Sequence, residues 1–120
     1  MRELSIGDRR YRISAVEREG SWLAHAEEAD SGHRFGVECA GATEAEAVDR
    51  VARWLDWQHE HTVALDALQS AERAYHRTMA GSAFVGAADE PTALDLQKES
   101  LEQVDAARVR LDEVRARKPA

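Results

Sequence analysis

The feature that most limits the fold of this chain is a long stretch without glycine or proline, over residues 42–80. Thr43 is a preferred helix N-cap residue, and Glu46, three residues later, completes a capping box. Apolar residues then recur at spacings of mostly three and four, which is the periodicity of one helix face. This first apolar stripe consists of Val48, Val51, Leu55, Thr62, Leu65, Leu68, Tyr75 and Met79. The sequence therefore predicts one long helix over residues 43–80.

A second helix is predicted over residues 91–118, after a connector over residues 81–90. Pro91 suits the first turn of a helix, because the missing N–H has no helical partner there. A second apolar stripe follows, made of Leu94, Leu101, Val104, Leu111 and Val114. An unbent helix over residues 43–80 is about 57 Å long, whereas a compact domain of this size has a radius of gyration of about 14 Å. We therefore expect the two stripes to pack against each other as an antiparallel helical hairpin.

Residues 1–42 follow a different period, because apolar and polar residues alternate there as they do in a half-buried strand. Leu4 and Ile6 belong to a first strand, and a last strand is expected from Phe35 to Cys39. The turn signals between strands are Gly7-Asp8, Gly20-Ser21 and Asp30-Ser31-Gly32. Such short connections force neighbouring strands to be antiparallel. The fold class predicted is therefore α+β: an antiparallel β-meander of three to four strands, then the two helices.

Length and charge limit the class of protein. A chain of 120 residues fits a single domain, here residues 1–120. The charged fraction of 32% exceeds the usual globular value and indicates much exposed helical surface. A net charge of −7 disfavours non-specific attraction to phosphate backbones and to anionic lipid surfaces. Neither a nucleic acid nor a membrane is therefore an expected partner.

The expected location is the cytoplasm. Cys39 is the single cysteine, so no disulfide forms within the chain and a reducing compartment fits best. The first residues lack the basic region and apolar run of a secretory signal. No stretch approaches the ~20 apolar residues that span a bilayer.

Two candidate reactive clusters are weak. His59 and His61 are two residues apart on the predicted helix, so they point about 200° apart, whereas the helical zinc motif needs histidines four apart. Cys39 with His25 or His33 is a conceivable thiol–imidazole pair, but the strand phase places Cys39 on the buried face, as a small hydrophobe. We therefore expect no enzyme, with no catalytic, cofactor-binding or metal-ligating residue and no cofactor.

Trp54 and Trp57 lie near the point where the first helix leaves the sheet, and both of their interpretations stay open. In one, they fill the core between sheet and helix together with Trp22. In the other, they form an exposed aromatic anchor for a partner, since tryptophan is enriched in interface hot spots. Trp54 and Trp57 are therefore the candidate partner-binding residues.

Two segments carry a family resemblance. The run Gly20-Ser21-Trp22-Leu23-Ala24 and the later run Gly41-Ala42-Thr43-Glu44-Ala45-Glu46-Ala47 resemble the HicB-like antitoxin domain. That family places a Gly-x-Thr-x-x-Glu-Ala turn at the start of the helix that covers its small sheet. The resemblance covers about residues 11–55 and implies a toxin-neutralising or regulatory protein, without assigning a site residue. The family usually continues with a short helix, whereas this chain continues with a long helical hairpin.

Three classes of function follow from these patterns. The favoured class is a non-enzymatic protein–protein interaction module that self-associates through its hairpin, as a homodimer, and binds an unidentified protein. Apolar residues beside the stripes widen each apolar face, and pairing two hairpins into a four-helix bundle covers them. These residues are Val63, Ala67, Leu96 and Ala107. The alternatives are a nucleic-acid-binding or HicB-like regulatory protein that uses the arginines of residues 8–12, and an enzyme with its site between sheet and helices.

Overall fold

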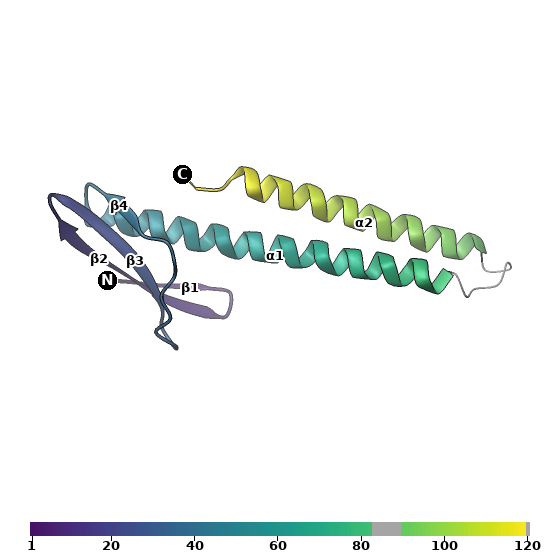
Figure 1. The fold of residues 1–120 in the computed structure, drawn as a ribbon, viewed down its shortest axis with the longest axis horizontal. Coiled ribbons are helices and arrows are strands. Elements are labelled where there is room, and N and C mark those ends of the chain that lie inside the picture. The colour runs from purple at the N-terminus through teal and green to yellow at the C-terminus, as the bar shows by residue number, and fades with distance from the viewer. Residues whose placement is uncertain (83–89, 120) are drawn as a thin grey trace. The chain divides into compact units, whose positions relative to one another are not determined.

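The computed structural model of the chain describes the backbone of residues 1–82 and 90–119, and the side chains of residues 1–80 and 94–119. It confirms the predicted α+β fold, in which a four-stranded antiparallel sheet is followed by one long and one shorter helix (Figure 1). Most of the predicted connector over residues 81–90 lies outside the described residues. The chain divides into two compact units. The sheet unit is Met1–His59 with Lys118–Ala120, and the hairpin unit is Glu60–Arg117. Whether both units unfold as the single predicted domain stays open to measurement.

The sheet is a meander in which each strand pairs with the next along the chain. Its strands are β1 (Arg2–Ile6), β2 (Arg9–Arg18), β3 (Ser21–Glu28) and β4 (Cys39–Gly41), in the spatial order β1-β2-β3-β4. The first two turns contain Gly7 and Gly20, whose φ angles of 61° and 81° lie in the left-handed region that glycine adopts without steric cost. Tight turns thus set the antiparallel register of the first three strands.

The last strand begins later than predicted. The expected strand started at Phe35, whereas β4 starts at Cys39. Glu27 pairs with Arg34, and Ala24 pairs with Cys39. Between these two pairs the chain advances by three residues on β3 but by five residues on the segment that leads into β4. The additional residues bend away from β3, which interrupts the ladder and leaves only a short strand beside it.

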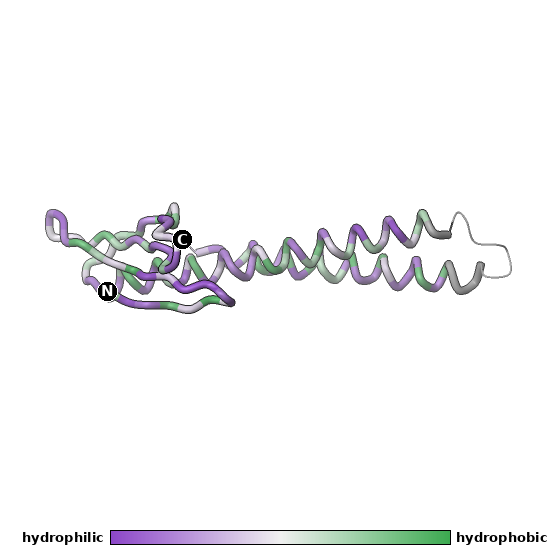
Figure 2. The backbone as a smooth tube through the Cα atoms, turned by 90° about the horizontal axis from the view of Figure 1, so that it is seen from below, coloured by the Kyte–Doolittle hydropathy of each residue, from purple (hydrophilic) through white to green (hydrophobic). Residues whose placement is uncertain are grey.

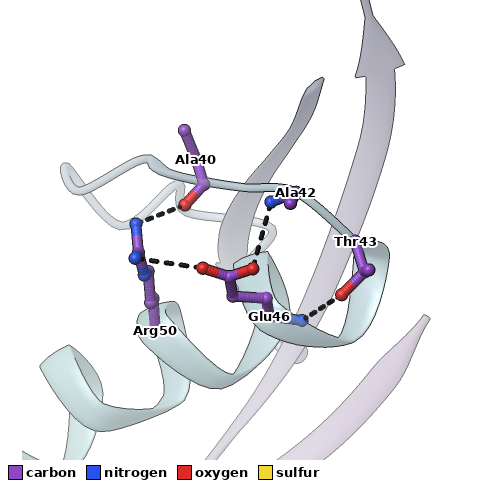
Figure 3. A network of polar contacts seen from close by, with 5 residues as sticks. All are labelled: Ala40, Ala42, Thr43, Glu46 and Arg50. Atoms are coloured by element: carbon purple, nitrogen blue, oxygen red, sulfur yellow. Dashed lines mark hydrogen bonds and ion pairs between the residues drawn. The ribbon is translucent and has the colours of Figure 1, made fainter. Parts of the chain in front are cut away.

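The long helix α1 (Glu44–Ser82) begins where the capping box was expected. The amide of Glu46 donates to Thr43 Oγ1 at 3.1 Å, and the amide of Ala42 donates to Glu46 Oε2 at 3.2 Å. Arg50 donates to the carbonyl of Ala40 at 2.8 Å and pairs with Glu46 at 3.1 Å (Figure 3). The first turn of α1 is therefore joined to the segment that leaves β4.

The core of the sheet unit lies between one sheet face and the first turns of α1. Gly41 is required at this junction, because a Cβ on it would lie 2.6 Å from the backbone nitrogen of Ala47. The side chains of the core are mostly small, which lets α1 approach the sheet closely. The buried residues are Ile6, Ile13, Ala24, Ala26, Cys39, Ala47, Val48, Val51, Ala52 and Leu55.

The hairpin unit contains the second half of α1 and all of α2 (Glu90–Ala116), running antiparallel (Figure 1). Two contacts fix the register. The hydroxyls of Thr78 and Ser100 lie 3.3 Å apart, and Arg117 pairs with Glu60 at 3.5 Å. The number of residues from Glu60 to Thr78 on the first arm of the hairpin equals, to within one, the number from Ser100 to Arg117 on the second arm. Two antiparallel helices with a constant register require this equality. The predicted antiparallel hairpin is thereby confirmed.

The seam between the two helices follows a strict heptad spacing of alternately three and four residues. Every one of its side chains is buried or half-buried, and polar residues alternate with apolar ones along both helices (Figure 2). The seam residues on α1 are His61, Ala64, Leu68, Ala71, Tyr75 and Thr78. Those on α2 are Gln97, Ser100, Val104, Ala107, Leu111 and Val114. Small and polar side chains thus form about half of this seam.

The second predicted stripe was partly wrong. Leu101 is 45% exposed and Leu94 is 56% exposed, so neither belongs to the seam. Their places are taken by Ser100 and Gln97, because packing follows the heptad spacing rather than the largest apolar side chain nearby. Met79, at the end of the first predicted stripe, is also outside the seam, at 43% exposure.

Candidate interaction surfaces

The two candidate tryptophans lie together on one face of α1. Trp54 and Trp57 are three residues apart, their ring centroids are 5.8 Å apart, and their planes meet at 82° in an edge-to-face arrangement. Both are half-buried, and Trp54 packs against the core of the sheet unit together with Trp22. The core interpretation therefore fits Trp22 and Trp54, while a partner-binding role of the pair stays a prediction.

A lysine from the end of the chain lies over this pair. The Nζ atom of Lys118 is 5.7 Å from the ring centroid of Trp54 and 5.9 Å from that of Trp57. Both distances are within the range of cation–π attraction. Nothing in the local sequence around Lys118 signals a contact with residues so distant in the chain. The contact joins the last residues to α1 within the sheet unit.

The hairpin unit carries large apolar side chains outside its seam. The residues more than 40% exposed are Val63, Met79, Leu94, Leu96, Leu101 and Val109. Val63 and Leu96 were predicted beside the stripes and are indeed exposed, whereas Ala107 lies in the seam. Large apolar residues thus lie outside the seam as well as within it, and the exposed ones make the hairpin a candidate interaction surface.

The heptad positions divide these residues between the two sides of the seam. Each heptad has two seam positions, called a and d; position e follows d, and position g precedes a. In an antiparallel pair of helices, the e positions of both helices lie on one side of the seam and the g positions lie on the other. Glu60 and Arg117 are both g positions, and their contact confirms this assignment. The opposite side, here called the leucine flank, consists of Leu65, Glu72, Met79, Leu94, Leu101, Arg108 and Arg115.

Within the described part of the chain, no ion pair includes the charged residues of the leucine flank, which are Glu72, Arg108 and Arg115. Arg108 lies on α2 within one turn of the height of Glu72 on α1, as the register requires. Among the described residues of the hairpin unit, the acidic and basic side chains in an ion pair are Arg110 with Glu113, at 3.8 Å, and Glu60 with Arg117, at 3.5 Å, and most other charges there resemble Glu72 and Arg108 in being outside any ion pair. The flank thus combines four apolar residues with one acidic and two basic ones.

The arginines of β2 do not form an uncompensated basic strip. Arg10 pairs with Asp30 at 3.0 Å, and Arg12 donates to the carbonyl of Ala29 at 3.0 Å. Arg12 also lies opposite Glu3 on β1 and Glu27 on β3, which place two carboxylates beside it on the same sheet face. The attraction of this edge for phosphate is therefore reduced by its own neighbours.

The conceivable thiol–imidazole pair is not assembled with His25. Cys39 is 9% exposed and lies opposite Ala24 on the core face, whereas His25 alternates to the other face of the sheet. Burial raises the pKa of the Cys39 thiol, and the nearby charge of Arg50 only partly offsets this. A raised pKa keeps the sulfur protonated and a poor nucleophile at neutral pH.

The histidines of α1 are directed to different surroundings. His61 is half-buried in the seam of the hairpin unit, and His59 lies against the β1–β2 turn, where a Cβ on Gly7 would be 3.1 Å from its Cε1 atom. Among the described residues, no three side chains of the metal-ligating types are grouped. Within that same part of the chain, neither helix has the length and apolarity needed to cross a bilayer.

Comparison of the chain with protein-family models, with curated proteins and with solved structures found no match. No relative therefore bears on the HicB-like resemblance, which stays a prediction from two short runs of residues. The surfaces described above are the observations from which a function is inferred.

Proposed function

We propose that this chain is a non-enzymatic protein–protein interaction module that self-associates through its helical hairpin, as a homodimer. The observation that carries the proposal is the number of large apolar side chains that lie outside the seam of the hairpin unit. Alanine, serine and threonine occupy several seam positions beside Leu68 and Leu111, while four other large apolar residues lie outside the seam and are about half exposed: Met79, Leu94, Leu96 and Leu101. A partner that covers these residues removes that apolar surface from water.

The size of the effect sets the conditions of the test. Burying a fully exposed leucine or methionine contributes about 1.5–3 kcal/mol, so a side chain that is already half-covered contributes about 1 kcal/mol. Four such residues on the leucine flank of each copy give ~8 kcal/mol for a dimer, against an association cost of about 4–15 kcal/mol. Self-association is therefore expected to depend on concentration, and to be visible in the micromolar range or above.

Light scattering coupled to gel filtration, over injected concentrations from micromolar to several hundred micromolar, tests the proposal directly. The expected result is a mass that rises towards twice the 13.4 kDa of one chain. A mass that stays at 13.4 kDa at the highest concentration overturns self-association. We place the protein in the cytoplasm, since its single free thiol suits a reducing compartment.

The alternative of a nucleic-acid-binding or HicB-like regulatory protein has less support. The arginines of β2 lie beside carboxylates, and the net charge of −7 opposes binding to phosphates. Fluorescence anisotropy with a labelled DNA duplex at low salt separates the two. Saturable binding that weakens steeply with salt supports the alternative, whereas its absence leaves the Trp54–Trp57 pair and the hairpin as the surfaces for a protein partner.

A further inference from the structure

The pair formed by Trp54 and Trp57 holds a cation at a corner between two aromatic rings. The two ring planes meet at 82°, and the ring centroids are 5.8 Å apart. The Nζ atom of Lys118 lies over both rings, at 5.7 Å and 5.9 Å from their centroids. Because these distances are nearly equal, the ammonium group faces both rings at once. All three residues belong to the sheet unit.

The distances leave space between the ammonium group and the rings. Apolar groups in direct contact have heavy atoms about 4.0–4.5 Å apart, and the nitrogen of Lys118 is farther than that from the Trp54 centroid, at 5.7 Å. A methyl group extends about 1.5 Å beyond the nitrogen that carries it, so a methyl carbon directed at the ring lies ~4.2 Å from the centroid. The spacing therefore suits an N-methylated ammonium group better than a bare one.

Aromatic faces, rather than carboxylates, surround this cation. Among the described residues, no ion pair includes Lys118. A carboxylate favours a compact, strongly hydrated ammonium group, which it binds by charge and hydrogen bonds. Aromatic rings favour quaternary ammonium groups, because these cations are weakly hydrated and lose little water on contact. The two rings are therefore expected to select a cation by its degree of methylation.

We propose that Trp54 and Trp57 form a binding site for an N-methylated lysine side chain of a partner protein, and that Lys118 occupies this site in the absence of the partner. The inference goes beyond the proposed function, because it needs no second copy of this chain. The occupant present in the structure, Lys118, is itself a lysine side chain. The net charge of −7 attracts the basic residues that flank such a lysine in a partner, which a free small cation lacks.

Lys118 is placed to exchange with such a ligand. Its side chain is exposed, and it lies beyond Ala116, the last residue of α2. Trp54 packs against the core of the sheet unit, so its ring stays in place when the lysine moves away. A ligand then competes with Lys118, and its apparent affinity is reduced by the fraction of the time that Lys118 covers the rings.

The first experiment titrates the isotope-labelled full chain with three peptides of one basic sequence, and follows the indole N–H signals of Trp54 and Trp57 by NMR. The central residue of the peptides is trimethyllysine, lysine, or the neutral analogue of trimethyllysine in which carbon replaces the charged nitrogen. The trimethyllysine peptide should bind about tenfold tighter than either of the others, because it alone combines the positive charge with methyl groups that reach the rings.

The contrary results of this titration are distinct. Equal affinities for the trimethyllysine and lysine peptides overturn the site, because net charge alone then attracts them. Equal affinities for the charged and neutral analogues overturn it as well, since a cation–π contact requires the charge. Choline that binds as tightly as the trimethyllysine peptide overturns the partner's side chain as the source of the ammonium group. Each result leaves self-association untouched, which gel filtration measures separately.

The second experiment removes the internal competitor. Lys118→Ala should bind the trimethyllysine peptide several-fold tighter, up to about tenfold, because the rings are then open all the time. Lys98→Ala, which makes the same change in net charge at an exposed site on α2, is the matched control and should bind like the wild type. A Lys118→Ala chain that binds no tighter than Lys98→Ala overturns the role of Lys118.

A third variant tests the rings themselves. Trp57→Leu keeps an apolar side chain at a half-buried position but removes the indole face, so it should lose the preference for trimethyllysine over lysine. Its circular dichroism spectrum should match that of the wild type. A folded Trp57→Leu chain that keeps the preference overturns the site, and the peptide series on the wild-type chain decides the question if this variant does not fold.

Discussion

Replacing Leu111 by alanine gives the sharpest test of the heptad seam. Leu111 is 2% exposed and lies in the seam between Ala107 and Val114. Truncating a fully buried leucine to alanine costs about 2–5 kcal/mol, because the removed atoms lose their burial and leave a cavity. The seam offers few large side chains that could close such a cavity, so the cost should lie at about 3 kcal/mol or above.

Leu101→Ala is the matched control for this variant. Leu101 is the same residue type on the same helix, but it is 45% exposed and outside the seam, so its truncation should cost about 1 kcal/mol or less in the monomer. Both variants make the same leucine-to-alanine change in helix propensity, so the difference between their free energies of unfolding reports the position of each residue in the heptad.

Thermal and urea unfolding, followed by circular dichroism at a concentration that keeps the chain monomeric, measure both variants. Leu111→Ala should lower the melting temperature by about 10 °C and Leu101→Ala by about 3 °C, at roughly 3–5 °C per kcal/mol for a chain of this size. Equal losses for the two variants would refute the assignment of Leu101 to the outside of the seam. The number of transitions also shows whether the sheet unit and the hairpin unit unfold together.

Three further predictions concern the sheet unit. Thr43→Ala removes the hydroxyl that accepts a hydrogen bond from the amide of Glu46, so it should reduce the free energy of unfolding by about 1 kcal/mol. The control is Thr62→Ala, on the exposed side of α1, which should change the free energy of unfolding little. Lys118→Ala removes the cation over Trp54 and should change tryptophan emission, with a stability loss of about 1 kcal/mol or less; an identical change in Lys98→Ala would contradict the contact. Because burial raises the pKa of the Cys39 thiol, a thiol reagent at pH 8 should label the native chain much more slowly than the urea-unfolded chain, and equal rates would place this sulfur at the surface.

The parts of the fold that the sequence predicted correctly have strong local signals. The capping box at Thr43 and Glu46 fixed the start of α1, since its two hydrogen bonds involve residues within one turn. The glycine turns fixed the first three strands, because their positive φ angles are set by the turn alone. Such features depend on a few neighbouring residues, and therefore survive without knowledge of the tertiary packing.

The errors occurred where the outcome depends on packing between distant segments. The predicted second stripe includes Leu101 because it follows apolar residues alone, but Ser100, one position earlier, fits the heptad that Val104 and Leu111 continue. The start of β4 depends on the register against β3, which no local pattern encodes. The position of Lys118 over the tryptophans likewise depends on where α2 ends relative to α1.

The small residues of the seam explain why the hairpin should present one broad surface rather than two separate stripes. Ala64 and Ala71 on α1, with Ala107 on α2, permit a close approach of the two helix backbones. Close approach brings the neighbouring e positions of both helices onto one continuous face, so that Leu65 and Leu101 lie on the same flank although they come from different helices. Larger seam residues would separate the helices and divide that flank. The alanines of the seam therefore join the e positions of both helices into one continuous face.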